Sequence, residues 1–288
     1  MHLGPYRVLR RLPGSGASEI VLCEDVQGVP VVVDRILPPL ARAPRFAKAL
    51  LRSAGALRRV SHGNIVPVEW VGELADAPAV VQRGLPGRDV REVYNRAYET
   101  QRSLPLGVSV QILADAAQGF AEAGRADPLL HGGIAPQNIW INDQGYGMAT
   151  HVARSALVHR AFYAQPSGRL RGSFTYSSPE QVRGLPPDAR TDVFALAIIL
   201  YEMTTGARLF KRGTPSEARA AVLDPRPRPP SELLPGSPKP LEQLVMQGLR
   251  AEPEARWPDL DRFARALERE VLSRMGPTRG EVRAFLSE

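Results

Sequence analysis

The 288-residue chain is expected to adopt an α+β fold of two lobes, in which a small lobe built on a sheet precedes a mainly helical lobe. Three observations predict this class. Short β-rich segments separated by Gly-containing turns fill residues 1–83. From residue 87 onward, apolar residues recur mostly at helical spacing. The chain is also long enough to form one large domain or two closely packed lobes.

The first lobe, residues 1–83, is predicted to be a five-stranded antiparallel sheet with one inserted helix. The helix spans about 45–60, because apolar residues fall on one buried stripe there. The Gly-rich turn at 13–18 could bring backbone N–H groups close to phosphates, but a plain hairpin turn has the same signature. The strands are expected at residues 6–12, 19–25, 28–37, 62–66 and 79–81.

The second lobe, residues 84–273, is predicted to be helical. The stretch 191–205 is almost wholly apolar, which indicates a helix buried at the centre of this lobe. Residues 223–240 are rich in proline, and we expect a connection between helices there, although a polyproline ligand for a partner domain has the same composition. The helices are expected at residues 108–126, 191–205, 216–222, 240–249 and 259–273.

The last segment, residues 274–288, is predicted to contain a short tail helix. Thr278 and Glu281 have the spacing of a capping box, and Val282 and Phe285 follow at helical spacing. This helix either docks on its own lobe or leads into a further module.

Composition and charge argue against several classes of protein. The net charge of +7 comes from arginines spread over every segment, so an ordinary solvated surface is favoured over a nucleic-acid-binding one. The histidines form no cluster with cysteine or carboxylates, so no metal site is predicted. The single Cys23 excludes a disulfide framework. Without a signal-peptide pattern or an apolar run near ~20 residues, we expect a cytoplasmic protein with no membrane span.

The strongest signal is the stretch His131–Ile141, which reads HGGIAPQNIWI and runs from a helix into an apolar strand. It resembles the catalytic loop of protein kinases, H-R-D-L-K-P-E-N-I-L-L, in the spacing of His131, Pro136 and Asn138. Other motifs follow in the family's order, namely SHGNIV at 61–66, GSFTY at 172–176, SPE at 178–180, the helix from 188 to 205 and PEARW at 253–257. From residue 6 to about 272 the chain resembles the bacterial relatives of eukaryotic serine/threonine protein kinases. The resemblance implies a two-lobed protein-kinase-like fold.

The resemblance also implies structural roles for four side chains. His131 would belong to the hydrophobic column between the lobes, and Asp192 would accept hydrogen bonds from the catalytic-loop backbone. Glu180 and Arg256 would form a partly buried bidentate ion pair, which is costly to break by removing one partner. The retained motifs are therefore those that hold the large lobe together.

The residues that carry phosphoryl transfer in the family are mostly replaced. Transfer depends on positioning and on neutralising the charge of the phosphates, and of the metal-holding set only Asn138 is retained. A positioned general base alone is worth about 10²–10⁴ in rate, so we expect no conventional kinase activity and absent or weak binding of ATP and Mg²⁺. The altered positions are Asp34 for the lysine of the third strand, Ser53 for the helix glutamate, Gly133 for the general base, Ala135 for the phosphate-facing lysine and Ala149 for the metal-binding aspartate.

The slot that holds adenine in the family is predicted to be occluded. By the resemblance, Ile20 and Val32 form its roof, Gln82 lies at its inner end and Trp140 forms its floor. An indole is about as large and flat as adenine, so Trp140 is expected to fill the slot partly or wholly from below. The alternative is that Trp140 packs beneath a cleft that stays open.

These features predict a pseudokinase, a binding module that acts as a scaffold or an allosteric regulator in bacterial signalling. Its expected partner is a protein, for example an active kinase. One candidate surface is the tail helix, and the other is the arginine-rich segment around 155–176, which suits an acidic or phosphorylated partner, with a solvated loop as the alternative. The arginines concerned are Arg154, Arg160, Arg169 and Arg171.

A second hypothesis makes the chain an enzyme. It would then be a residual or unconventional ATP-dependent serine/threonine kinase, or a nucleotidyl transferase, that uses Asn138, Asp143 and scattered carboxylates. The two hypotheses differ in whether ATP with a divalent cation stabilises the fold, because a ligand stabilises the state that binds it.

Overall fold

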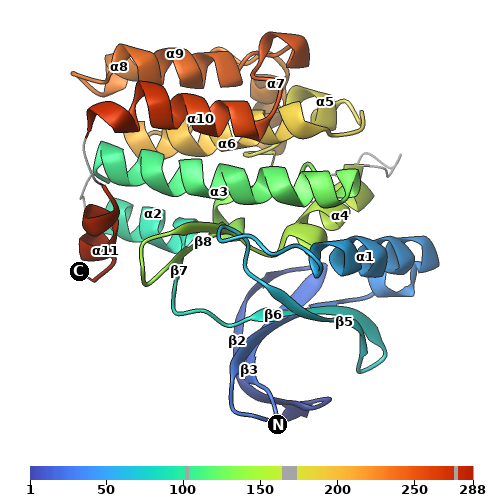
Figure 1. Cartoon of the computed structure of the whole chain (residues 1–288). Coiled ribbons are helices and arrows are strands. Elements are labelled where there is room, and N and C mark those ends of the chain that lie inside the picture. The colour runs from blue at the N-terminus through green and yellow to red at the C-terminus, as the bar shows by residue number, and fades with distance from the viewer. Residues whose placement is uncertain (101–103, 164–173, 276–277, 288) are drawn as a thin grey trace.

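The computed structural model describes residues 1–100, 104–163, 174–275 and 278–287, and it shows the two predicted lobes (Figure 1). The small lobe combines an antiparallel sheet with helix α1 (Pro44–Leu57), and the large lobe is a stack of helices. The predicted α+β class is confirmed. No helix in the described part of the chain is both long and apolar enough to cross a membrane.

The small lobe is built on a six-stranded sheet in the order β1-β2-β3-β4-β6-β5, antiparallel throughout. Two of the six strands were not predicted, namely β5 and β1, a two-residue strand that pairs with the start of β2. The strands are β1 (His2–Leu3), β2 (Tyr6–Ser15), β3 (Ser18–Glu24), β4 (Pro30–Ile36), β5 (Val68–Leu74) and β6 (Ala77–Arg83).

The predicted strand at residues 62–66 was wrong, because this segment bonds to the large lobe instead of to the sheet. The Val66 N–H donates to the Ala149 carbonyl at 2.9 Å, and the Ala149 N–H donates to the Asn64 carbonyl at 2.8 Å. Strand β5 begins only after Pro67, which has no N–H to give to a ladder. The segment therefore joins the lobes.

The large lobe is organised around the central helix α6, as predicted. Every side chain from Thr191 to Thr204 is buried, and a capping box of Asp188 and Thr191 begins the helix. Gly206, with φ +71°, ends it in the left-handed conformation that glycine adopts without strain. The helices are α2 (Val90–Glu99), α3 (Leu106–Ala126), α4 (Val152–Tyr163), α5 (Pro179–Val182), α6 (Ala189–Thr205), α7 (Pro215–Leu223), α8 (Pro230–Leu233), α9 (Lys239–Gly248), α10 (Leu260–Glu270) and α11 (Arg279–Ser287).

Four of these helices, α2, α4, α5 and α8, were not predicted. The short α8 lies within the proline-rich connection, whose interpretation as a link between helices otherwise agrees with the structure. Helix α4 matters most for the site. Its polar residues Arg154 and Ser155 are buried together with its apolar ones, so its sequence lacks the polar face by which a surface helix is identified.

The tail helix α11 docks on the large lobe beside α3 (Figure 1). Arg279 donates to Asp115 on α3 and to the Gly145 carbonyl at 2.7 Å, and its guanidinium stacks 4.0 Å from the centre of the Tyr146 ring. Thr278 Oγ1 bonds to Gln111 Oε1 at 2.8 Å. Of the two predicted positions for the tail, the structure shows docking on its own lobe.

One apolar core runs through both lobes. Leu50 and Leu57 of α1 belong to the same cluster of buried side chains as Phe120 of α3 and Phe194 of α6. A second, smaller cluster lies on the opposite face of the small-lobe sheet. The contact between the lobes is therefore partly a continuous hydrophobic core, which opposes rotation of one lobe relative to the other.

Candidate functional site

The stretch that resembles a catalytic loop is held by Asp192 of α6. His131 Nδ1 lies 2.6 Å from Asp192 Oδ2, and the Gly132 N–H donates to Asp192 Oδ1 at 2.8 Å. Burial would lower the pKa of His131, but the hydrogen bond and charge of Asp192 raise it overall. Asn138 Nδ2 donates to the Gly133 carbonyl at 2.7 Å. The loop is thus anchored to the centre of the large lobe.

Glu180 and Arg256 form the ion pair that the resemblance implied. Both bonds of the fork, Nη1 to Oε1 and Nη2 to Oε2, are 2.8 Å long, and both residues are buried. Burial would raise the pKa of Glu180, but Arg256 and the Thr191 hydroxyl lower it. Arg256 also donates to three backbone carbonyls, so both charges are well satisfied.

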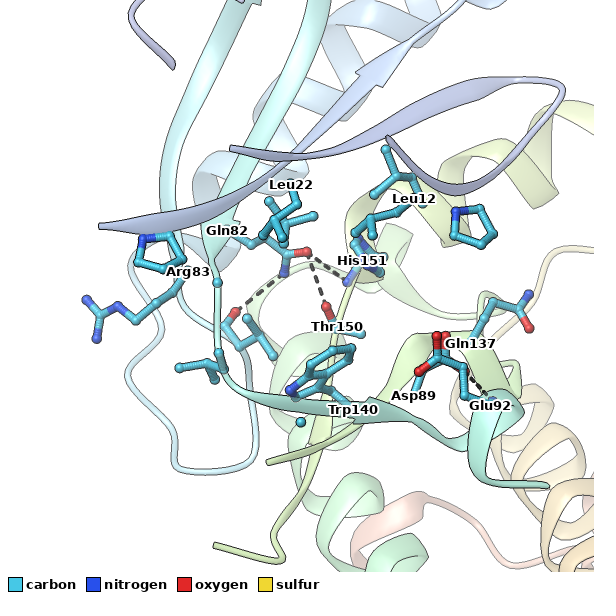
Figure 2. A pocket seen from close by; sticks show the side chains of 18 of the residues that line it. Leu12, Leu22, Gln82, Arg83, Asp89, Glu92, Gln137, Trp140, Thr150 and His151 are labelled. Atoms are coloured by element: carbon cyan, nitrogen blue, oxygen red, sulfur yellow. Dashed lines mark hydrogen bonds between the residues drawn. The ribbon is translucent and has the colours of Figure 1, made fainter. Parts of the chain in front are cut away.

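A cavity of about 470 Å³ lies between the two lobes. Leu12 and Leu22 cover it from the sheet side, and the indole of Trp140 lies beneath it (Figure 2). The other residues predicted for the slot, Ile20, Val32 and Gln82, also line this cavity. Its volume falls in the range of small-molecule pockets, roughly 300–1,000 Å³.

The prediction that Trp140 fills the slot was wrong. Trp140 lies on β8 (Ile139–Asn142), between β7 (Gly87–Asp89) and β9 (Gly147–Ala149), and its half-buried indole forms the floor of an open cavity. Gly87 makes room for the indole. A side chain there would place its Cβ 2.8 Å from Trp140 Nε1, and the φ of +145° at Gly87 also favours glycine.

The inner end of the cavity is polar and is organised by the buried Gln82 on β6. Its Oε1 accepts hydrogen bonds from the Thr150 hydroxyl at 3.3 Å and from the His151 N–H at 3.1 Å (Figure 2). Its Nε2 donates to the Val66 carbonyl at 3.5 Å. Gln82 therefore connects the sheet to the segment that follows β9.

Asp34, at the position of the missing lysine, contacts the side chains of a histidine and an arginine. Its Oδ2 lies 2.7 Å from His151 Nδ1 and 3.5 Å from Arg154 Nε. Burial would raise the pKa of Asp34, but His151 and Arg154 together lower it. The carboxylate is thus charged and compensated. Sequence reasoning found neither His151 nor Arg154 in this role, because it gave His151 no role and assigned Arg154 to a partner surface.

Ser53, at the position of the helix glutamate, does not face Asp34. Its hydroxyl donates to Asp127 Oδ2 at 2.7 Å, and Asp127 also accepts from the Leu129 N–H at 3.0 Å. The hydrogen bond links α1 of the small lobe to the start of the loop in the large lobe. This hydrogen bond joins the two lobes, and neither Ser53 nor Asp127 lines the cavity.

Helix α4 packs directly on Gly133, the position of the general base. Gly133 is buried, and a Cβ added there would lie 2.5 Å from the backbone nitrogen of Ala156. The neighbouring Ala135 is also buried. The space into which a catalytic carboxylate would project is therefore occupied by the backbone of α4.

Two of the four arginines predicted to bind a partner have partners within the chain. Arg154 is only 7% exposed and lies between Asp34 and Asn138. Arg160 donates to the carbonyls of Pro128, Leu129 and Pro187. Assigning Arg154 to a partner surface was wrong, because it is buried where α4 packs against α1 and the loop, whereas Arg160 is half-exposed. Two others, Arg169 and Arg171, lie outside the described residues.

The residues at the inner end do not suit a divalent cation. Gly133 and Ala149 supply no ligand, and Asn138 Oδ1 accepts a hydrogen bond from the Arg154 guanidinium at 3.5 Å. Asp143 lies in the exposed turn after β8, outside the residues that line the cavity. Among the described residues, no three His, Cys, Asp or Glu side chains gather where they could hold a metal.

Two lobes joined at such a cavity, with an anchored loop below it, define a protein-kinase-like fold. The kinase domain of Mycobacterium tuberculosis PknI superimposes with a TM-score of 0.72 at 20% identity, covering 94% of this chain and 98% of that one. The family model described as protein tyrosine and serine/threonine kinase matches residues 21–267. The chain belongs to this family, and the predicted family resemblance is confirmed.

Curated relatives are bacterial kinases of greater length. Tyrosine-protein kinase MasK of Myxococcus xanthus is 33% identical over 282 residues, which cover 92% of this chain and 43% of that protein. Serine/threonine-protein kinase PknB of Mycobacterium leprae is 29% identical over 253 residues, which cover 84% and 39%. This chain spans less than half the length of these relatives.

Proposed function

We propose that the chain is a pseudokinase, a kinase-family module that transfers no phosphoryl group and regulates a signalling protein by binding it. The contact between α4 and Gly133 carries this proposal. The helix backbone fills the space of a general base, so a hydroxyl acceptor has neither a base nor room beside it. A general base contributes about 10²–10⁴ in rate, and here its loss is combined with the loss of metal ligands.

The other replaced positions support the same proposal. Asp34 is held by His151 and Arg154, and Ser53 bonds to Asp127. These contacts are internal, as expected of side chains that serve the fold. The buried networks of the large lobe are intact, which supports a role that requires the shape of a kinase without its reaction.

The catalytic half of the proposal is tested by incubating the purified chain with radiolabelled ATP, Mg²⁺ or Mn²⁺ and a mixed protein substrate. We expect no more label than with an Asn138→Ala variant, which lacks the last retained residue of the metal-holding set. Label that appears with the parent chain and disappears with Asn138→Ala would overturn the proposal.

The regulatory half is tested in cells. A regulator that works by binding should function without Asn138, so Asn138→Ala should restore the phenotype of a deletion strain as fully as the parent chain does. Failure of Asn138→Ala to restore it, at equal protein level, would point to chemistry at this site.

A further inference from the structure

We propose that the groove between α1 and β5, on the small lobe, is a docking surface for an acidic segment of a partner protein. In the segment that fits it, an apolar side chain is flanked by carboxylates. This inference rests on the proposed function in one respect, the role of the chain as a binding module. It goes further by assigning the surface that binds and the chemistry of what is bound.

The excess positive charge of the chain is concentrated around α1. Between Asp34 and Glu69 the sequence contains six arginines and one lysine but no carboxylate. Arginines occur throughout the chain, but outside this stretch the carboxylates equal the cations in number. The stretch therefore accounts by itself for the formal net charge of +7. A surface with a single sign of charge attracts partners of the opposite sign.

Most of these cations lie on the surface. Arg35 and Arg52 have ion-pair partners within the chain. Arg58 and Arg59, directly after the last residue of α1, are exposed, and in the described part of the chain their guanidinium groups have no hydrogen-bond or ion-pair partner. These two groups are therefore available to carboxylates of another molecule. The other exposed cations of the stretch are Arg42, Arg45 and Lys48.

A groove of about 490 Å³ lies beside these two arginines. It runs between α1 and its neighbour β5 (Figure 1). The half-buried side chains of Leu51 on α1 and Val71 on β5 give it an apolar part. Apolar surface next to unpaired cations suits a ligand of mixed character. The described residues that line the groove are Leu51, Gly55, Arg58, Arg59, Val71 and Gly72, and none of them is acidic.

Gly55 keeps this groove open. Glycine is less favourable than alanine inside a helix, and no atom lies within 4 Å of the position that a Cβ of residue 55 would take. Packing within the chain therefore gives no reason for a glycine at this position. A partner's side chain that enters the groove gives one.

The same features favour a protein segment over other polyanions. A membrane-binding helix inserts large apolar side chains, and in the described part of the chain no exposed side chain of this kind lies between residues 35 and 68. Single-stranded nucleic acids stack on aromatic side chains, but Phe46, the one Phe, Tyr or Trp of the stretch, packs against the core. Clusters of arginine are in contrast typical of sites that recognise acidic motifs.

Fluorescence anisotropy with labelled peptides tests the proposal on the purified chain. The probe is a hexapeptide with two leucines between pairs of glutamates, and two comparison peptides have serine in place of leucine or lysine in place of glutamate. We expect the probe to bind at least about tenfold more tightly than either comparison peptide, because it alone offers both apolar surface and negative charge.

The charge of the surface is tested with Arg58→Gln and Arg59→Gln combined. This variant should bind the probe about fivefold more weakly, and the difference should shrink at high salt because the charges are exposed. The matched control combines Arg262→Gln and Arg265→Gln, which removes the same charge from exposed positions on α10. Binding of the probe to the control should equal binding to the parent chain.

The groove is tested with Gly55→Leu. The new side chain fills the groove, so binding of the probe should weaken about tenfold or more. Leucine favours a helix more than glycine does, so an unchanged or higher melting temperature is expected and shows that the variant is folded. The matched control Gly280→Leu places leucine on α11, where again no atom lies within 4 Å of the new Cβ, and should leave binding unchanged.

Several outcomes would overturn the inference. They are absence of probe binding, equal binding of the three peptides, and equal losses in either variant and its control. Binding to phosphatidylserine vesicles or to single-stranded RNA that Gly55→Leu does not change, without binding of the probe, would assign the surface to a membrane or a nucleic acid instead.

The inference and the proposed function fail separately in the deletion strain. At equal protein level we expect Gly55→Leu to lose the function that Asn138→Ala keeps. If Gly55→Leu restored the phenotype as fully as the parent chain, only the docking surface would be removed. Failure of Asn138→Ala would instead count against the proposed function.

Discussion

At the scale of single residues, the site depends on charges whose partners come from distant parts of the chain. Asp34 is tolerated in a buried position because His151 and Arg154 surround its carboxylate. The sequence identified Asp34 as a reversal of sign, but it could not show how that charge is compensated, because the compensating residues follow β9. The pair of Glu180 and Arg256 was predictable because both residues lie within recognisable motifs.

His159 on α4 also determines how the free energy of unfolding depends on pH. Burial, and then the charge of Arg154, lower the pKa of His159 from 6.5 to about 4. The unfolded chain therefore binds a proton at a pH where the folded chain does not, and stability falls as the pH decreases from 6.5 towards 4. This one group accounts for up to ~3 kcal/mol over that interval.

We expect His159→Gln to remove this part of the pH dependence of the unfolding free energy, measured by urea denaturation at a series of pH values. The control His2→Gln changes an exposed histidine and should leave the profile as it is. If His159→Gln and the parent chain had parallel profiles between pH 6.5 and 4, the assignment to His159 would be wrong.

At the scale of elements, the helices differ in how well the sequence predicts them, and α4 is the main failure. Long helices with a clear stripe or a continuous apolar run, such as α3 and α6, were predicted close to their observed bounds. Helix α4 was not, because it packs against α1 and the loop, so that even its polar residues Arg154 and Ser155 are buried. Burial of this kind depends on tertiary packing and leaves no periodic pattern.

Restoring the general base should therefore harm the fold. In Gly133→Asp the new Cβ would lie 2.5 Å from the backbone of α4, and overpacking of this kind costs about 1–3 kcal/mol. We expect a lower melting temperature and no gain of kinase activity. Gly63→Asp introduces the same side chain where no atom lies within 4 Å of the new Cβ, and it should be nearly neutral. A stable Gly133→Asp variant would show that α4 moves easily away from the loop.

At the scale of the whole molecule, the two lobes were predictable and their coupling was not. The change from strand patterns to helix patterns predicted the two lobes, and the family motifs predicted the loop in the large lobe. The segment 62–66, the hydrogen bond of Ser53 with Asp127 and the shared core all join parts far apart in sequence. The open cavity was expected only as the alternative for the same reason, since the room beside the Trp140 indole is left by Gly87 on another strand.

The coupling predicts that the lobes unfold together in the parent chain. Trp70 on β5 and Trp257 in the large lobe allow each lobe to be followed by fluorescence in single-tryptophan variants, which should share one midpoint. Asp127→Ala removes the hydrogen bonds of Ser53 and Leu129 at the cost of about 1–3 kcal/mol, and it should separate the two midpoints.

The matched control is Asp25→Ala, which removes a carboxylate that accepts from the N–H groups of Gln27 and Val29 within the small lobe. It should lower both midpoints together. Midpoints that already differ in the parent chain, or that separate equally in both variants, would contradict tight coupling of the lobes.

The position of Trp140 also gives the molecule an optical property of its own. Its indole faces the cavity between the lobes, whereas Trp70 and Trp257 do not line that space. A flat compound entering there comes into contact with one fluorophore out of the three in the chain. Replacing Trp70 and Trp257 by phenylalanine would leave a label-free sensor of occupancy, with which a compound collection can be screened before the natural occupant is known.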